Sequence, residues 1–327
     1  MEEEFREQYV KDRPQLEAWG SFVCSYICAE LESVLAGSSN CELFLKIPPT
    51  PRLKKEKSIL DKAFRRNKNY SDPYAEITDK VGVRFVVLLI KDILVVTNII
   101  ESAPHWIASK DRDFQVEREH NPLIFDYQSE HYIVRAAAAQ SYNGVQIAEG
   151  TPCEVQVRTL LQHAYSEMAH DSVYKPTIRT DPAILRKIAR SMALIETTDD
   201  VFSDVSEVLS NRAAQLSRYE KSLIDLYVKL IGSEPFPDHA FTAQVVEVFS
   251  EEVEGTDLTS LEDFFKNHTG LIDIIAGFNG QSFVYSQPTV LFLYYLISKS
   301  HHRFRARWPG AEQDIFPLFR DLGISVS

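Results

Sequence analysis

The sequence predicts an α+β protein in which a segment of interleaved strands and helices precedes a mainly helical C-terminal domain. Apolar, β-branched runs recur between about residues 81 and 159 and are separated by amphipathic helical patterns. Beyond Pro176 the helical pattern continues while strand signals largely disappear. We place the two domains at residues 1–205 and 206–327, and residues 232–237, rich in glycine and proline, end the helix near this boundary.

The first elements surround a strongly basic segment. Apolar positions at mixed three- and four-residue spacing over residues 5–35 predict one helix or a pair of helices, ending at the Gly, Ser and Asn cluster 37–40. Residues 58–66 are basic and have helical periodicity. We therefore expect positive side chains to rise from one short helix and the loop before it.

The central elements combine strands and helices. Residues 81–90 predict a buried strand, and residues 92–102 predict an amphipathic helix. Strands are expected around 114–119, 131–138 and 153–159, followed by a helix over about 160–171. Asp181 and Pro182 then supply an N-cap and a first helical position for the next helix.

Composition narrows the class of protein. The chain has 327 residues, of which 44% are hydrophobic and 25% charged, as in an ordinary globular protein. Its apolar runs are far shorter than the roughly 20 residues of a membrane-spanning helix, and its start lacks the basic and apolar pattern of a secretory signal. We expect a cytoplasmic protein with no membrane partner. The four cysteines lack zinc-type spacing, which favours buried thiols.

Charge is unevenly distributed along the chain. The net charge of −12 argues against a broad polyanion-binding surface. Between residues 46 and 68, however, nine Lys or Arg face only two acidic residues, whereas residues 232–263 contain nine acidic residues and no Lys or Arg. A small anionic ligand in a focused basic site fits this asymmetry.

Two segments carry carboxylates where catalysis could use them. Glu154, Gln156 and Arg158 alternate with valines, so a strand here presents all three side chains on one face. Asp79 stands just before the buried strand, where a carboxylate can hold Mg²⁺ against a nucleotide phosphate. Taken separately, the first segment also fits a solvated edge strand, and Asp79 fits a turn.

Two further segments carry rings and imidazoles. Tyr127, Ser129 and His131 share one face at the entry to a strand, which offers a ring to stack on a base and polar groups to fix it. His163 and Glu167 lie on one face of the helix after Arg158. With His170 they could suggest a metal site, but the zincin spacing is absent, so we do not expect zinc.

Together these segments resemble the synthetase domain of the RelA/SpoT family over about residues 40–205. Residues 52–62 look like its Arg-x-Lys…Ser-Ile-x-x-Lys ATP segment, and residues 79–84 like its Asp-x-x-Gly-x-Arg metal motif. Residues 127–131 are similar to its acceptor motif, and residues 154–159 to Glu-Val-Gln-Ile-Arg-Thr. Residues 161–171, with Tyr174 and Lys175, fit the closing motif. One such motif is weak evidence, but five in the family's order are strong.

The resemblance implies a nucleotidyltransferase-like mixed sheet flanked by helices, and an ATP-dependent transfer of the β,γ-pyrophosphate to the 3′-hydroxyl of GDP or GTP, giving (p)ppGpp. It implies Mg²⁺ as the cofactor, with Asp79 and Glu154 as metal-binding and catalytic residues. The implied ATP-binding residues are Arg52, Lys54, Ser58, Lys62 and Arg84. The implied acceptor-binding residues are Tyr127, His131, Gln156, Arg158, His163 and Glu167.

Two departures from the family pattern leave the acceptor open. Asp126 stands where the family has glycine, and residues 117–122 replace a basic Pro-Lys-x-Asn segment. An acidic replacement weakens attraction for a free nucleotide diphosphate or triphosphate. The alternatives are pyrophosphate transfer to the 3′ end of tRNA or to an adenine nucleotide, and a catalytically inactive nucleotide sensor.

Residues 206–327 carry no recognised motif. Residues 287–298 form a strongly apolar helix candidate followed by basic residues 299–307, which suggests the core of a small helical domain. This domain is a candidate for homo-oligomerisation or for a regulatory partner. Attraction between its acidic stretch and the basic segment 46–68 predicts that truncation near residue 232 raises activity.

Overall fold

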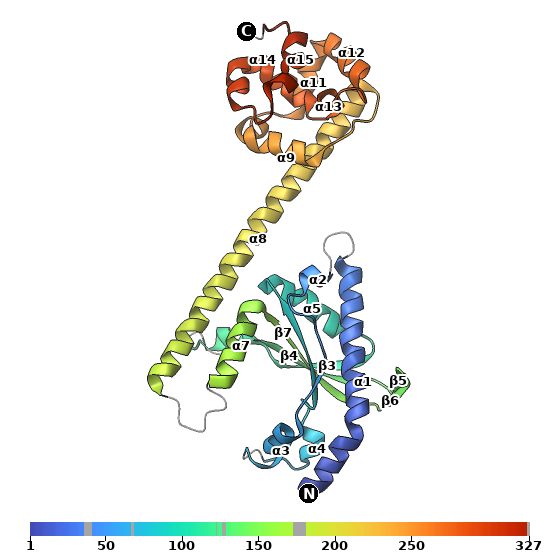
Figure 1. The fold of residues 1–327 in the computed structure, drawn as a ribbon, viewed down its shortest axis with the longest axis vertical. Coiled ribbons are helices and arrows are strands. Elements are labelled where there is room, and N and C mark those ends of the chain that lie inside the picture. Colours follow the sequence, from blue (N-terminus) through green and yellow to red (C-terminus); the bar gives the residue numbers. More distant parts are fainter. Residues whose placement is uncertain (36–40, 67–68, 122, 126–128, 173–180, 326–327) are drawn as a thin grey trace. The chain divides into compact units, whose positions relative to one another are not determined.

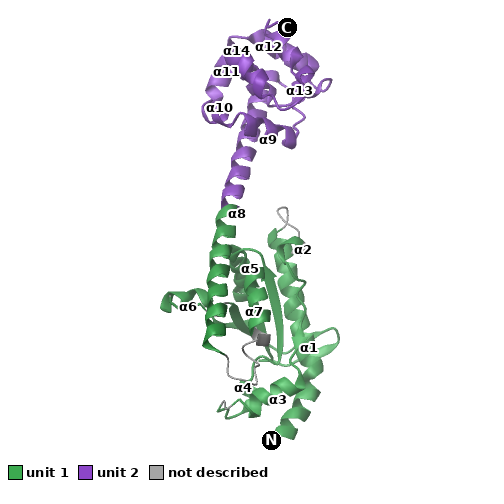
Figure 2. Ribbon diagram, turned by 60° about the vertical axis from the view of Figure 1, so that its left-hand side comes forward, with its two compact units in different colours: residues 1–205 green, residues 206–327 purple. Residues whose placement is uncertain are grey.

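The chain forms two compact units, residues 1–205 and 206–327 (Figure 2). The computed structural model describes residues 1–35, 41–66, 69–121, 123–125, 129–172 and 181–325. Each unit has a hydrophobic core of its own.

A five-stranded mixed sheet forms the centre of the N-terminal unit (Figure 1). The strands lie in the order β1-β2-β7-β4-β3, with β2 and β7 parallel and the other neighbours antiparallel. Their bounds are β1 Arg52–Leu53, β2 Val81–Val87, β3 Trp106–Arg112, β4 Glu130–Ala136 and β7 Pro152–Thr159. A separate hairpin, β5 Gln140–Tyr142 and β6 Val145–Ile147, turns at Asn143 and Gly144, which adopt the positive φ angles (49° and 78°) that tight hairpin turns favour.

Helices cover the sheet and extend the unit. Their bounds are α1 Glu2–Leu35, α2 Cys41–Phe44, α3 Glu56–Phe64, α4 Pro73–Glu76, α5 Ile90–Ser102, α6 Phe114–His120, α7 Leu160–Ser172 and α8 Pro182–Ile231. The leading segment is thus one helix, which continues through Pro14. Helix α8 begins in the N-terminal unit and ends in the C-terminal unit.

The two faces of the sheet differ in chemistry because strand residues alternate. Val83, Phe85, Val155 and Val157 point to one face, where they join a core with α1 and α5. Burial of each such side chain contributes about 1.5–3 kcal/mol. The residues between them, including Glu154, therefore share the opposite face of the sheet. Helix α7 follows β7 directly in the chain.

The structure confirms most of the predicted elements and corrects one. The predicted strand over residues 114–119 is wrong, because Phe114–His120 forms α6. The Asp113 side chain caps this helix by accepting hydrogen bonds from the backbone N–H groups of Gln115 (3.0 Å) and Val116 (3.1 Å). The strand of this region lies earlier, at Trp106–Arg112.

The C-terminal unit is helical throughout its described part. After α8 come α9 His239–Val248, α10 Ser250–Glu254, α11 Leu258–Lys266, α12 Thr269–Phe278, α13 Phe283–Ser286, α14 Val290–Arg307, a 3₁₀ turn Glu312–Asp314 and α15 Phe316–Asp321. The apolar first half of α14 is buried at the centre of the unit, as the sequence predicts. The predicted fold class is confirmed: a mixed sheet flanked by helices, followed by a mainly helical part.

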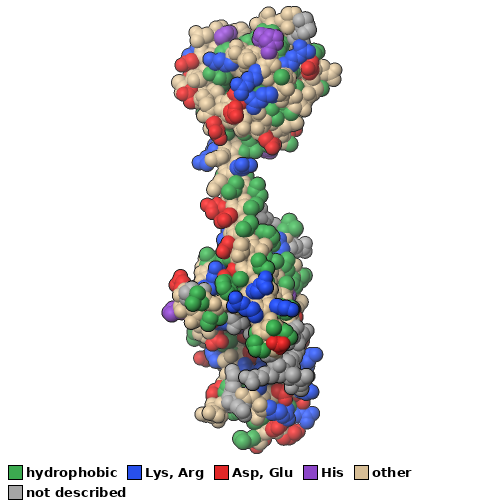
Figure 3. Space-filling model, turned by 90° about the vertical axis from the view of Figure 1, so that its left-hand side faces the viewer, with side chains coloured by type: hydrophobic (Ala, Val, Ile, Leu, Met, Phe, Trp, Pro, Cys, Tyr) green, Lys and Arg blue, Asp and Glu red, His purple; other side chains and the backbone are tan. Residues whose placement is uncertain are grey.

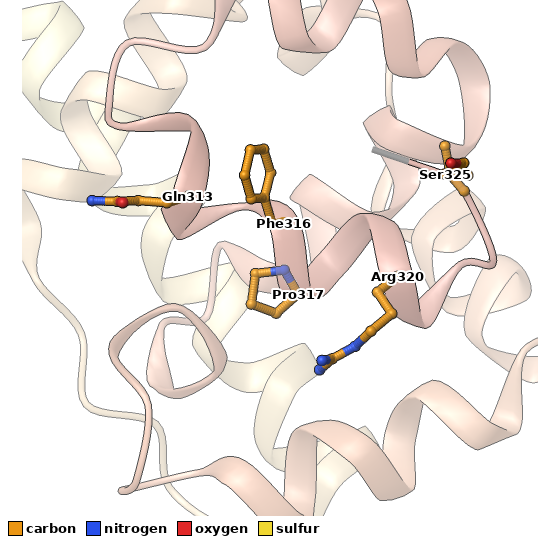
Figure 4. Close-up of a pocket in the computed structure, with 6 residues that line it drawn as sticks. Gln313, Phe316, Pro317, Arg320 and Ser325 are labelled. Carbon is orange, nitrogen blue, oxygen red and sulfur yellow. The ribbon is translucent and has the colours of Figure 1, made fainter. Parts of the chain in front are cut away.

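The surface of the C-terminal unit is charged and locally hollowed. Acidic and basic side chains lie near one another on the face shown in Figure 3. A pocket of about 430 Å³ is lined by residues on and around α15 (Figure 4), namely Gln313, Phe316, Pro317, Arg320, Ile324 and Ser325. Among the described residues, no helix has the length and apolar character needed to cross a membrane.

Candidate active site

Asp79 lies between two lysines at the start of β2. Lys54 follows β1 and forms an ion pair with the Asp79 carboxylate. Lys62 Nζ, from α3, lies 2.8 Å from the same oxygen, Asp79 Oδ2. The fold fixes both lysines, because Tyr9 on α1 donates a hydrogen bond to the Lys54 carbonyl (2.5 Å), and α3 buries Ile59 in the core.

The electrostatics keep Asp79 ionised. Burial acts to raise the pKa of this carboxyl, but the charges and hydrogen bonds of Lys54 and Lys62 outweigh burial, so its pKa lies below the ordinary value. The second oxygen, Asp79 Oδ1, is buried and has no hydrogen-bond partner among the described residues. A buried, ionised carboxylate with a spare oxygen fits a hard cation such as Mg²⁺, which typically takes only one or two protein carboxylates and completes its shell with water and phosphate oxygens.

A row across the sheet links the basic segment to Glu154. In this register Arg52 on β1 lies opposite Gly82 on β2, and Gly82 lies opposite Glu154 on β7. A Cβ atom at position 82 would approach the Glu154 carbonyl to 3.3 Å and Glu154 Oε2 to 3.7 Å. Glycine therefore leaves the space beside the Glu154 carboxylate open.

Side chains along β7 form a hydrogen-bonded chain. Gln156 Nε2 donates to Glu154 Oε2 (2.9 Å), and Arg158 Nη2 donates to Gln156 Oε1 (2.8 Å). His131 on β4 faces the same carboxylate, with 3.4 Å between His131 Nδ1 and Glu154 Oε1. The predicted shared face of Glu154, Gln156 and Arg158 is thus present, and Arg158 is fully buried in it.

Helix α7 adds a second charged group above this face. Arg84 Nη1 and Glu167 Oε1 are 2.9 Å apart, which joins a predicted ATP-binding residue to a predicted acceptor-binding residue. The two side chains are 41% and 56% exposed, so the pair itself adds little stability. Burial, together with the positive charges of Arg158 and Arg84, lowers the pKa of His163 although Glu167 acts in the other direction.

The structure gathers most of the predicted residues into these three groups. Ser58 stands one helical turn before Lys62 on α3, on the same side of the helix. Tyr127 lies outside the described residues. The roles assigned to these residues stay predictions.

Lys80 is a buried charge that none of the sequence motifs marks. Its ammonium donates to the Ile77 carbonyl (2.7 Å) and lies 4.5 Å from the centre of the Tyr74 ring. Burial first, and the charge of Arg135 second, lower its pKa to about 8, against the pull of nearby aspartates. The sequence offers one weak signal: Lys80 directly precedes the buried strand, where a long side chain can be covered.

Two arginines on and next to α6 have acidic partners. Arg112 on β3 lies 2.7 Å from Glu117 on α6, measured from Nη2 to Oε2. Arg118 on α6 lies 3.5 Å from Glu196 on α8. These acidic partners reduce the positive field around the two arginines.

The candidate site thus consists of Glu154 on a polar face of the sheet and the lysine-paired Asp79 just before β2. In a comparison with protein families, residues 51–179 match the family model described as the region found in RelA / SpoT proteins. This match confirms the resemblance inferred from the motifs for residues 51–179.

Solved structures with a similar arrangement include three bacterial proteins. Small alarmone synthetase 1 from Bacillus subtilis, bound to its product pppGpp, is 18% identical, with a TM-score of 0.49 over 64% of this chain and 99% of that chain. Small alarmone synthetase 2 from the same organism is 18% identical, with a TM-score of 0.46 over 60% of this chain and 98% of that chain. A GTP pyrophosphokinase family protein from Streptococcus pneumoniae is 18% identical, with a TM-score of 0.48 over 65% of this chain and 96% of that chain. No curated protein sequence matches this chain.

Proposed function

We propose that this protein is an ATP-dependent pyrophosphokinase that transfers the β,γ-pyrophosphate of ATP to the 3′-hydroxyl of GDP or GTP. The observation that carries the proposal is the lysine-paired Asp79, with its spare buried oxygen, in a segment that matches the RelA/SpoT region and also presents Glu154 on a polar face of the sheet. The name of one similar protein's bound product, pppGpp, agrees with a guanosine acceptor.

The reaction assigns separate tasks to these groups. The acceptor 3′-oxygen attacks the β-phosphorus of ATP, the bond between the α,β-bridging oxygen and that phosphorus breaks, and AMP leaves. Glu154 accepts the proton of the attacking hydroxyl. Arg52, Lys54 and Lys62 bind the polyphosphate and stabilise the charge that develops on it. Asp79 would hold Mg²⁺ with Glu154 as a second ligand, and the metal would neutralise phosphate charge.

A direct transfer assay tests the proposal. Purified protein is incubated with γ-labelled ATP, Mg²⁺ and, in separate reactions, GDP, GTP, ADP or deacylated tRNA. Label in a guanosine product together with an equal amount of AMP is the expected result. Absence of label in every acceptor would remove the enzymatic proposal and favour a nucleotide-binding sensor.

A second acceptor class has a specific observation in its favour. Glu117 and Glu196 pair with the arginines on and before α6, so this region offers little free positive charge to a nucleotide 5′-polyphosphate. The 3′ end of tRNA carries no such group at its reacting nucleotide. Label in tRNA, with none in GDP or GTP, would select this acceptor.

A further inference from the structure

The position of Arg158 makes a direct contact with an acceptor molecule difficult. Its side chain is completely buried, and its Nη2 atom donates to Gln156 Oε1 at 2.8 Å. Gln156 in turn donates to Glu154 Oε2 at 2.9 Å. The three residues alternate along β7, so the strand itself aligns them on one face.

The chemistry of the three groups fixes the direction of this chain. A guanidinium only donates hydrogen bonds, and an ionised carboxylate only accepts them. Gln156 can therefore satisfy both neighbours in one orientation alone, with its carbonyl oxygen toward Arg158 and its NH₂ toward Glu154. The amide then has one defined rotamer, and it holds one carboxylate oxygen of Glu154.

We propose that Arg158 and Gln156 are positioning residues, which act through one another to hold Glu154 in its reactive orientation and do not contact the acceptor. The inference rests on the proposed function, in which Glu154 accepts a proton. With Oε2 held by Gln156, the other oxygen, Oε1, faces His131 across the sheet. Gly82 keeps the space beside this carboxylate open.

Steady-state kinetics separate positioning from acceptor binding. Gln156→Met keeps the length of the side chain and removes both hydrogen bonds, and Arg158→Lys keeps the charge and removes the forked donor. We expect each change to lower kcat by about 10- to 100-fold, as small misplacements of a catalytic group do, while the KM of ATP and acceptor stays within about twofold. Gln146→Met, at an exposed position on β6, is the matched control with unchanged kinetics.

The opposite kinetic pattern would overturn the proposal. A raised acceptor KM with unchanged kcat in Gln156→Met or Arg158→Lys would make these residues acceptor contacts. Circular dichroism spectra of both variants verify that the fold is retained.

A thermal double-mutant cycle tests the same chain without any activity. If Arg158 acts through Gln156, the loss in Tm caused by Arg158→Lys becomes smaller in the Gln156→Met background, because the shared hydrogen bond is already gone. Additive losses would refute the linkage even if no acceptor is ever found. Wild-type protein that transfers no pyrophosphate, but shows the non-additive cycle, would instead count against the proposed function alone.

Discussion

Asp79 carries the negative charge that Lys54 and Lys62 neutralise, and Asp79→Asn removes this charge with almost no change in volume. We expect transfer activity to fall at least about 100-fold, as when a group that stabilises transition-state charge is removed. Labelled-ATP transfer measures the loss, and Mn²⁺ binding in the presence of a non-hydrolysable ATP analogue, followed by electron paramagnetic resonance, measures the metal site directly. Asp111→Asn, at an exposed position on β3, is the control. Full activity of Asp79→Asn would refute the assigned role.

Glu130 is a buried acid whose protonation links stability to pH. Burial raises its pKa to about 7, although Lys110, 3.1 Å from Oε2, pulls it down. Because the folded-state pKa exceeds the unfolded value, this group favours folding below the unfolded pKa, and its contribution is lost as pH rises through about 7. A shift of this size corresponds to about 3 kcal/mol.

Glu130→Gln should therefore narrow the difference in stability between pH 5 and pH 8. The amide cannot ionise, so the variant avoids the burial of a charge at high pH, at the expense of the contact with Lys110. Urea unfolding at the two pH values measures the effect. An equal change in the free energy of unfolding at both values would show that Glu130 does not titrate in this range.

Single residues also mark how far the sequence alone could predict the site. The alternation in residues 154–158 predicts a shared face, and the structure has it. The ion pairs of Asp79 could not be predicted, because Lys54 and Lys62 reach it from a loop and a helix that come together only when α3 packs on α1. The burial of Arg158 could not be predicted from the sequence either, since it depends on which parts of the chain cover the strand.

At the scale of elements, hydrophobic periodicity predicts those helices and strands that the local sequence determines. The strands near residues 81–87, 130–136 and 152–159 and the helices on either side of them follow from apolar spacing. Residues 114–119 mislead because their pattern is short, and the capping aspartate at 113 decides in favour of a helix. Sheet order and register depend on contacts distant in sequence, and spacing carries no information about them.

The first part of α8 is joined to the end of β7 by a buried polar contact. Thr159 Oγ1 donates to Asp199 Oδ2 (2.8 Å), and both side chains are almost completely buried. Thr159→Val leaves the carboxylate without this donor and should lower the free energy of unfolding by about 1–3 kcal/mol. Chemical denaturation measures the change. Thr197→Val, at an exposed position on α8, should stay within about 0.5 kcal/mol of wild type, and equal losses in the two variants would contradict the role of the contact.

At the scale of the whole molecule, the two separate cores predict two unfolding events. Residues 1–205 and 206–327 each enclose their own cluster of buried side chains, and only the first carries the proposed ATP site. Calorimetry should show two transitions, and Mg²⁺ with a non-hydrolysable ATP analogue should raise the temperature of one of them alone. A single transition, raised as a whole by the ligand, would show that the units unfold as one.

Ion pairs within the C-terminal unit bear on the prediction that its acidic stretch lowers the activity of the full-length protein. Glu252 lies beside Arg303 and Arg307 of the same unit, and Glu262 lies beside Lys229 and Lys266. Acidic residues that already have cationic partners attract a second basic segment less strongly. Higher activity on truncation near residue 232 therefore stays a prediction, and the charge count alone overstates its driving force.

The lysine pair around Asp79 has a consequence for the order in which ligands enter. Before ATP arrives, Lys54 and Lys62 serve as counter-ions for the very carboxylate that a divalent cation needs. The triphosphate competes for the same lysines, so its binding frees the Asp79 carboxylate. The metal ion then binds to this carboxylate. Calorimetric titration should show weak Mn²⁺ binding to the free enzyme and at least about tenfold tighter binding once an ATP analogue is present, a coupling of about 1.4 kcal/mol. Lys62→Gln should strengthen Mn²⁺ binding in the absence of nucleotide; unchanged binding there would mean that the lysine does not exclude the ion.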